Sequence, residues 1–196
     1  MLCYCSFPFS SDGTCDSEQI ASSTSYDCPG GPEQSDNDWC SVFPASNILS
    51  LDDDEWNGSV GSPANYWLSE EGKTGEEQGF IMYLGCNKTV KGVSLKNTHN
   101  AGHHDRSTRK FRILGSATEN GPWQELLVAN DEDMERRRRA YGPGWLALVQ
   151  DTPVQQLMFA KPTDVSFIKF ELLEYHGHGG GLQYFAIGKA SSRGNK

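Results

Sequence analysis

The chain has 196 residues, of which 21 are glycine, and its formal net charge is −9 at pH 7. This length provides for one domain with a short appendage, and the glycine content favours a loop-rich β domain over a helical bundle. An acidic chain repels nucleic acid and anionic membranes at long range, and no apolar run is long enough to span a bilayer.

Residues 1–40 are rich in cysteine and otherwise have the composition of turns and coil. The six cysteines of the chain are Cys3, Cys5, Cys15, Cys28, Cys40 and Cys86. Their crowding among Ser, Gly and Asp predicts a disulfide-stapled, mostly irregular extension over residues 1–40 of a secreted or cell-surface protein. The sequence does not choose among the pairings, although a Cys40–Cys86 bond would pin the edge of the main domain. Reduced thiols in an intracellular protein are the alternative.

Two further features bear on the cellular compartment. The triplets Asn57-Gly58-Ser59 and Asn87-Lys88-Thr89 are N-glycosylation acceptors, which fits an extracellular chain. The N-terminus shows neither the basic nor the apolar segment of a secretory signal. A removed signal, excision from a longer chain and a protein that is not secreted all account for this.

From about Ser41 onward, short apolar runs alternate with turn residues, as is typical of β-strands. Val93 and Leu95 share one face of such a run, as do Phe111 and Ile113 in the next. The run over residues 165–175 is the clearest, because Ile168, Phe170 and Leu172 alternate with Lys169 and Glu171. The predicted strands are residues 79–85, 91–97, 109–116, 144–150, 154–160, 165–175 and 181–188.

This many short strands predicts an all-β domain, a β-sandwich over residues 41–190, followed by a flexible tail at residues 191–196. Residues 130–142 are the one helical candidate, since acidic residues precede the run Arg136–Arg139 and this order suits a helix dipole. The segment has little apolar face, which favours a charge-balanced surface excursion over a polyanion-binding patch.

The order of features from residue 40 to residue 188 resembles the discoidin family, also called coagulation factor V/VIII type C domains. The stretches that carry the resemblance are "NYWLSEEGKTGEEQGFIMYLGC", "DRSTRKFRILGSATENGPWQELL" and "FIKFELLEYHGHGGGLQYFAI". The matching residues are Trp67, Leu84, Gly85, Ser116, Gly121 and Trp123, followed by a Gly-rich turn at residues 179–181. The resemblance implies a galactose-binding-like jelly-roll β-sandwich, and residues 1–40 lie outside it.

The sequence also departs from this family at two places. Fucose-binding relatives carry an Arg-x-Asp motif, whereas the local order here is Asp105-Arg106. Membrane-binding relatives expose apolar side chains on loops at one end, but the corresponding loop here, "LDDDEWNGSVGSPAN", is acidic and has Trp56 as its one large apolar residue. Membrane insertion through this loop is therefore not expected. The sizes of Trp67, Trp123 and Trp145 suit the sandwich core.

Two loops are candidate ligand sites, because imidazole and guanidinium donors suit sugar hydroxyls, carboxylates and sulfates. The first is "NTHNAGHHDRSTRKF", residues 97–111, and the second is the turn at residues 175–181. The predicted ligand-binding residues are His99, Asn100, His103, His104, Tyr175, His176 and His178. Asn97, Asp105, Arg106 and Thr108 are predicted to brace the first loop. The alternative for both loops is a well-tied turn with solvated histidines.

A third cluster lies on the loop before the first of the quoted stretches. Asp52, Asp54 and Asn57 offer hard oxygen ligands on one loop, which favours a structural Ca²⁺ ion; a solvated acidic turn is the alternative. The spacing is not that of an EF-hand.

No catalytic or phosphate-binding fingerprint occurs, so we do not expect an enzyme. The predicted function is a non-catalytic extracellular recognition or adhesion module. It binds a glycan or an extracellular protein through loops at one end of the sandwich, and nucleic acid is not among its expected partners. The alternative is a structural or docking subunit of a larger assembly, which contacts neighbouring subunits and takes no small ligand.

Overall fold

The computed structural model describes residues 18–23, 45–49, 66–70, 72, 74, 78–98, 106–129 and 154–189. These ranges contain β1 (Gln19–Ser23), η2 (Ala45–Leu49), β2 (Trp67–Leu68), β3 (Gly79–Asn97), β4 (Arg106–Ser116), β5 (Gln124–Ala129), β6 (Gln155–Gly177) and β7 (Gly181–Lys189). Every strand pair among them is antiparallel, and the all-β prediction is confirmed. Among the described residues, no helix is long and apolar enough to cross a membrane.

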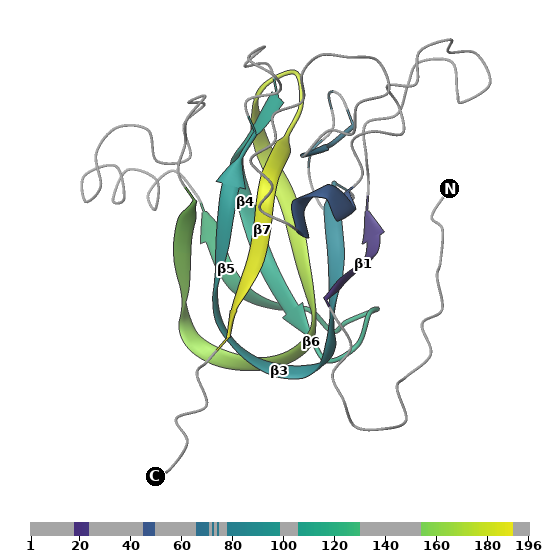
Figure 1. Cartoon of the computed structure of the whole chain (residues 1–196), viewed down its shortest axis with the longest axis vertical. Coiled ribbons are helices and arrows are strands. Elements are labelled where there is room, and N and C mark those ends of the chain that lie inside the picture. The colour runs from purple at the N-terminus through teal and green to yellow at the C-terminus, as the bar shows by residue number, and fades with distance from the viewer. Residues whose placement is uncertain are drawn as a thin grey trace, which may run out of the picture.

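Two long strands, β3 and β6, run through both layers of a β-sandwich. In the first layer the order is β1-β3-β6-β4-β5, formed by the first half of β3 and the second half of β6. In the second layer the order is β2-β7-β3-β6, formed by the other halves of the same two strands. Both strands bend at the lower end of the molecule in Figure 1, so the two layers are continuous there.

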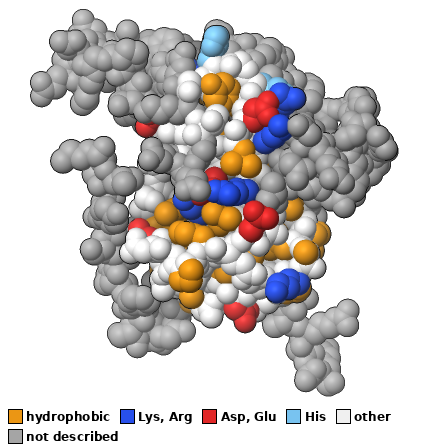
Figure 2. Space-filling view, turned by 180° about the vertical axis from the view of Figure 1, so that it is seen from behind, with side chains coloured by type: hydrophobic (Ala, Val, Ile, Leu, Met, Phe, Trp, Pro, Cys, Tyr) orange, Lys and Arg blue, Asp and Glu red, His pale blue; other side chains and the backbone are white. Residues whose placement is uncertain are grey.

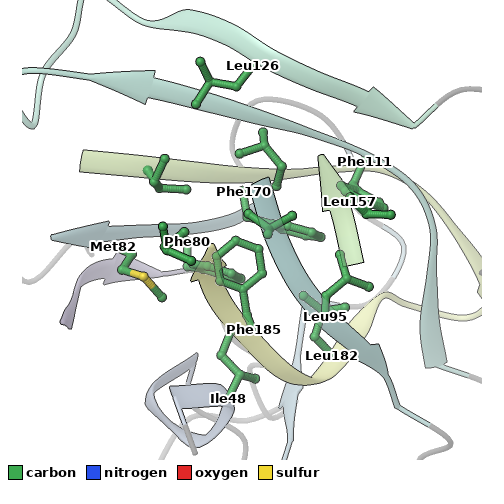
Figure 3. Close-up of a cluster of buried hydrophobic side chains, with 14 of the residues drawn as sticks. Ile48, Phe80, Met82, Leu95, Phe111, Leu126, Leu157, Phe170, Leu182 and Phe185 are labelled. Carbon is green, nitrogen blue, oxygen red and sulfur yellow. The ribbon is translucent and has the colours of Figure 1, made fainter. Parts of the chain in front are cut away.

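The core lies between the layers and is built from the alternating apolar positions. Ile168, Phe170 and Leu172 are each 0 % exposed, which confirms that they share the inner face of β6. Phe170 stacks on Phe80 with ring centroids 5.1 Å apart, and Phe185 of β7 meets Phe80 edge-on (Figure 3). Full burial of a side chain of this size stabilises the fold by about 1.5–3 kcal/mol.

The two long strands correct the sequence prediction of separate short ones. Residues 79–85 and 91–97 belong to one strand, β3, and residues 154–160 and 165–175 belong to one strand, β6. Register shifts between Tyr83 and Lys88 let β3 bend without ending, because an irregular ladder position allows a strand to change direction. The predicted strand at 144–150 and the helical candidate at 130–142 lie outside the described residues.

The structure also adds an edge strand within the predicted N-terminal extension. β1 pairs with β3 in the first layer, where Gln19 lies opposite Tyr83 and Ile20 opposite Met82. Ile20 packs against the hydrophobic core. Residues 19–23 therefore belong to the sandwich, although their composition gave little strand signal.

Of the three tryptophans expected in the core, the structure places Trp67 there and Trp123 elsewhere. Trp67 is 0 % exposed and meets Phe80 and Phe170 edge-on. Trp123 is half-buried, and its ring lies 5.9 Å from the Nζ atom of Lys169, a residue of the outer face of β6. Trp123 precedes β5 rather than standing at an inner position of it, which is why the size of its side chain was a poor guide. Trp145 lies outside the described residues.

Candidate functional site

One end of the sandwich, called here the upper end, brings together the described flanks of both candidate loops. Arg106 at the start of β4 lies opposite Gly177 at the end of β6, and Thr108 lies opposite Tyr175. Asn97 at the end of β3 lies opposite Leu182 of β7. The two loops therefore leave from the same end, as expected from the strand order, and this end is at the top of Figure 1.

Asn97 and Thr108 fix the base of the first loop by reciprocal hydrogen bonds. Asn97 Nδ2 donates to the carbonyl oxygen of Thr108 over 2.8 Å, and the Thr108 backbone N–H donates to Asn97 Oδ1 over 3.0 Å. Thr108 Oγ1 also donates to the carbonyl oxygen of Gly181 over 3.0 Å. All three bonds are buried, so each satisfies a group that would otherwise lose hydration without compensation.

A second set of hydrogen bonds ties the segment after β2 to the β6–β7 turn. The Ser69 N–H donates to the carbonyl oxygen of Gly180 over 3.0 Å, and the Gly180 N–H donates to Ser69 Oγ over 2.9 Å. The Gly72 N–H donates to the carbonyl oxygen of His178 over 3.1 Å. Neither Ser69 nor Gly72 was among the predicted site residues, although Ser69 lies two residues after Trp67, which is one of the residues that carry the family resemblance.

The glycines of the β6–β7 turn are required by close packing. A Cβ atom on Gly180 would lie 2.5 Å from Leu172 Cδ2, and one on Gly181 would lie 2.6 Å from Thr98 Cγ2 and 2.7 Å from the carbonyl oxygen of Trp67. Neither glycine has a positive φ, so of the two roles that glycine plays in turns, close backbone approach is the one used here. The turn is consequently packed against both neighbouring segments.

The side chains of this end differ in how much solvent they reach. His178 is exposed, and Tyr175 and His176 are partly buried, with Tyr175 packed against the core. Arg106 is buried, and its Nη1 atom lies close to Gly179, where a Cβ atom would be 3.1 Å away. In Figure 2 histidine side chains are visible at the upper end. Imidazole, phenol and guanidinium groups together provide donors and acceptors for hydroxyl or acidic groups.

Several predicted site residues lie outside the described residues. They are the ligand-binding candidates His99, Asn100, His103 and His104, the brace residue Asp105, and the calcium candidates Asp52, Asp54 and Asn57. Within the ranges that the structure describes, no group of three or more His, Cys, Asp or Glu side chains is placed to hold a metal ion. Cys86 of β3 is disulfide-bonded, and the pairing predicted for it stays a prediction.

The comparisons with known proteins give a fold and no family. No protein-family profile matches the sequence, and no curated protein matches it. The solved structures that resemble it include CBM32-1 from a family 31 glycoside hydrolase of Clostridium perfringens, with 14% identity, 91% of this chain and 98% of that chain covered, and a TM-score of 0.56. They also include the family 32 carbohydrate-binding module of Streptococcus pneumoniae EndoD, with 12% identity, coverage of 90% and 98%, and a TM-score of 0.53.

At these identities the likeness concerns the fold. It confirms the predicted galactose-binding-like, discoidin-type jelly-roll β-sandwich. The likeness to CBM32-1 covers 91% of this chain.

Proposed function

We propose that this chain is a non-catalytic module that binds a glycan at the upper end of the sandwich. The observation that carries the proposal is the way this end is fixed. Hydrogen bonds of Ser69 with Gly180, of Asn97 with Thr108 and of Thr108 with Gly181 join the segment after β2, the β6–β7 turn and the two strands that flank the first loop. The chain shares its fold with carbohydrate-binding modules of other proteins, which supports a glycan as the ligand class.

A fixed end favours binding because little conformational freedom is lost when the ligand arrives. The backbone carbonyl of His178 is held by the Gly72 N–H while its side chain is exposed. His178 is therefore presented to solvent from an ordered position, beside the partly buried His176 and Tyr175. Hydrogen-bonding side chains on an ordered backbone suit the recognition of sugar hydroxyls.

An array of neutral glycans probed with the whole chain tests this function. We expect a subset of glycans to bind, and the variant His178→Ala to bind them about tenfold more weakly, as for the loss of one hydrogen bond to a polar partner. The variant Lys161→Ala, at an exposed position of β6 away from the upper end, is the control and should bind as the unmodified chain does. If no glycan binds and a pull-down from native extract recovers a stable protein complex instead, the docking-subunit alternative replaces this proposal.

We further propose that the protein is extracellular, in an adhesion or recognition role. The disulfide bond of Cys86 supports this, because disulfides persist in oxidising compartments. Non-reducing mass spectrometry of the natively expressed protein should detect disulfide-linked peptides from residues 1–40. Six free thiols in that measurement would contradict both the stapled extension and the extracellular location.

Calcium binding by Asp52, Asp54 and Asn57 is proposed on the chemistry of this side-chain set alone, since carboxylate and amide oxygens are the ligands Ca²⁺ prefers. Bound calcium would raise the free energy of unfolding by about 2.7 kcal/mol at a hundredfold excess over its dissociation constant. Thermal melting in millimolar Ca²⁺ and in EDTA measures this difference. Identical melting curves would count against a calcium site.

A further inference from the structure

The outer face of the β4–β6 pair carries four cations arranged around two carboxylates. We call this surface the cationic face, and its residues are Arg109, Lys110, Arg112, Lys169, Glu171 and Glu174. Glu171 accepts a hydrogen bond from Arg112 Nε and ion-pairs with Lys169 Nζ over 2.5 Å. Glu174 ion-pairs with Lys110 Nζ over 2.7 Å and with Arg109. Neighbouring basic and acidic side chains of this kind are visible in Figure 2.

Strand register explains how each carboxylate comes to hold two cations. Arg112 lies directly opposite Glu171, and Lys110 lies directly opposite Glu174, so both pairs are cross-strand neighbours. The register shifts between Thr108 and Lys110, which makes Arg109 an extra residue in β4. Such a bulge re-aims a side chain, and it allows two consecutive residues of β4 to reach the same carboxylate.

Of the two carboxylates, Glu171 is hidden beneath the cations that it holds, whereas the side chain of Glu174 is 34% exposed. The side chain of Glu171 is 1% exposed, whereas those of its partners Arg112 and Lys169 are 27% and 21% exposed. Solvent therefore meets the guanidinium and ammonium groups and hardly meets this carboxylate. The cationic face itself comprises four cations and two carboxylates, and the exposed Glu125 lies on the neighbouring strand β5, opposite Leu114.

Trp123 lies next to Lys169 and adds an aromatic surface. Lys169 Nζ is 5.9 Å from the centroid of its ring, within the range of a cation–π contact. The ring is half-buried and follows the exposed residue Pro122. An aromatic ring beside fixed cations combines a surface for the apolar face of a sugar with donors for its acidic substituents.

We propose that the cationic face is a second binding site, separate from the upper end, for an acidic glycan. The carboxylate or sulfate groups of the glycan would bind Arg109, Lys110 and Arg112 by charge-assisted hydrogen bonds, and a sugar ring would lie against Trp123. The ligand class rests on the proposed glycan-binding function, but the site uses none of the residues of the upper end.

An acidic glycan fits this face better than an anionic membrane does. Surface insertion into a bilayer requires exposed apolar side chains. Among the described residues the one large hydrophobic side chain that is well exposed is Met158, at 58%. It lies opposite Gly92 in the second layer, whereas the cationic face belongs to the first.

Titration calorimetry of the whole chain with polygalacturonate, with heparin and with a neutral galactan tests the proposal. We expect at least one acidic polymer to bind in a salt-dependent manner. The double variant R109Q/K110Q should weaken this binding about tenfold and lower the slope of log affinity against log salt concentration by about two. The matched control K91Q/K161Q removes the same charge from the second layer and the β6 bend, and should leave the affinity unchanged.

A third variant has an expected effect of opposite sign. Glu174→Gln removes a carboxylate that competes with the ligand for Arg109 and Lys110, so it should tighten binding by about threefold. The control Asp164→Asn makes the same charge change at an exposed position of β6 and should leave the affinity unchanged.

Three outcomes would overturn the proposal. Equal losses in R109Q/K110Q and K91Q/K161Q would mean that net charge alone governs binding. Loss of acidic-polymer binding in His178→Ala would place that ligand at the upper end. Binding to vesicles rich in phosphatidylserine, without binding to either acidic polymer, would identify a membrane as the ligand. Because the array with neutral glycans reports on the upper end separately, failure of the cationic face is distinguishable from failure of the proposed function.

Discussion

The upper end and the cationic face are both polar, but different forces hold their side chains in place. At the upper end the hydrogen bonds that fix the loops join neutral, buried groups, as in the bond from Thr108 Oγ1 to the carbonyl oxygen of Gly181. On the cationic face the groups are charged, and the side chain of Arg109 is 41% exposed. Salt screens exposed charges over a Debye length of about 8 Å at physiological ionic strength. Salt should therefore separate the two regions in a stability measurement.

Breaking the packing of the upper end should have the largest effect. In Gly181→Ala the new Cβ atom would lie 2.7 Å from the carbonyl oxygen of Trp67 and 2.6 Å from Thr98 Cγ2, and a backbone atom cannot move aside as a flexible side chain can. We expect the free energy of unfolding to fall by about 3 kcal/mol. Urea denaturation followed by tryptophan fluorescence measures this change.

Gly72→Ala provides the matched control for this prediction. Gly72 has a φ of +71°, but no atom lies within 4 Å of the position of its Cβ. The cost should therefore be that of the left-handed backbone alone, about 1 kcal/mol. Equal losses in the two variants would show that packing at Gly181 is not the reason for its glycine.

Removing one hydrogen bond of the upper end should have the next largest effect. Thr108→Val keeps the shape of the side chain but leaves the buried carbonyl oxygen of Gly181 without this donor. The expected loss is about 1.5 kcal/mol. Because the bond joins neutral groups, the loss should be the same at low ionic strength and in about 1 M NaCl. A loss that shrank markedly in salt would contradict the assignment of neutral forces to this end.

On the cationic face, Glu171→Gln tests the buried carboxylate. The variant keeps the side-chain volume but removes the charge that holds Arg112 and Lys169. Both cations reach solvent and can recover part of their hydration, so we expect a loss of only about 1 kcal/mol in urea denaturation. A loss as large as that of Gly181→Ala would mean that the two cations depend on this carboxylate far more than their exposure indicates.

The smallest effect is expected for Glu174→Gln. Its ion pairs with Arg109 and Lys110 are more exposed than those of Glu171, and exposed pairs contribute about 0.5 kcal/mol. The loss should disappear in about 1 M NaCl, which salt-dependent denaturation curves can show. Persistence of the full loss at high salt would remove the distinction between the two regions.

The sequence predicted the inward face of the sandwich well, for a local reason. Ile168, Phe170 and Leu172 alternate with polar residues, and the period of two that defines a strand is visible in one stretch of chain. Strand ends were predicted less well. The turn residues near Gly85 occur where β3 bends through both layers, and composition does not distinguish a bend from a turn.

The polar regions depend on contacts that are distant in sequence. Ser69 and Gly180 are 111 residues apart, and Arg112 and Glu171 are 59 residues apart. Alternation placed Glu171 on the outer face, but its burial follows from partners that only the folded ladder supplies. For the upper end, the sequence placed both loops at one end because consecutive antiparallel strands return there. It did not reveal the contribution of the segment after β2.

The two long strands have a consequence for how the molecule unfolds. β3 and β6 each belong to both layers, and they pair with each other from Gly79 with Glu171 to Leu95 with Gln155. Neither layer can therefore unfold without disrupting strands that also form the other layer. Partial opening in which one layer melts while the other persists is thereby suppressed. Amide hydrogens in the middle of both layers should exchange through one global opening event rather than through two independent ones. Such contacts between distant parts of the chain also favour slow folding.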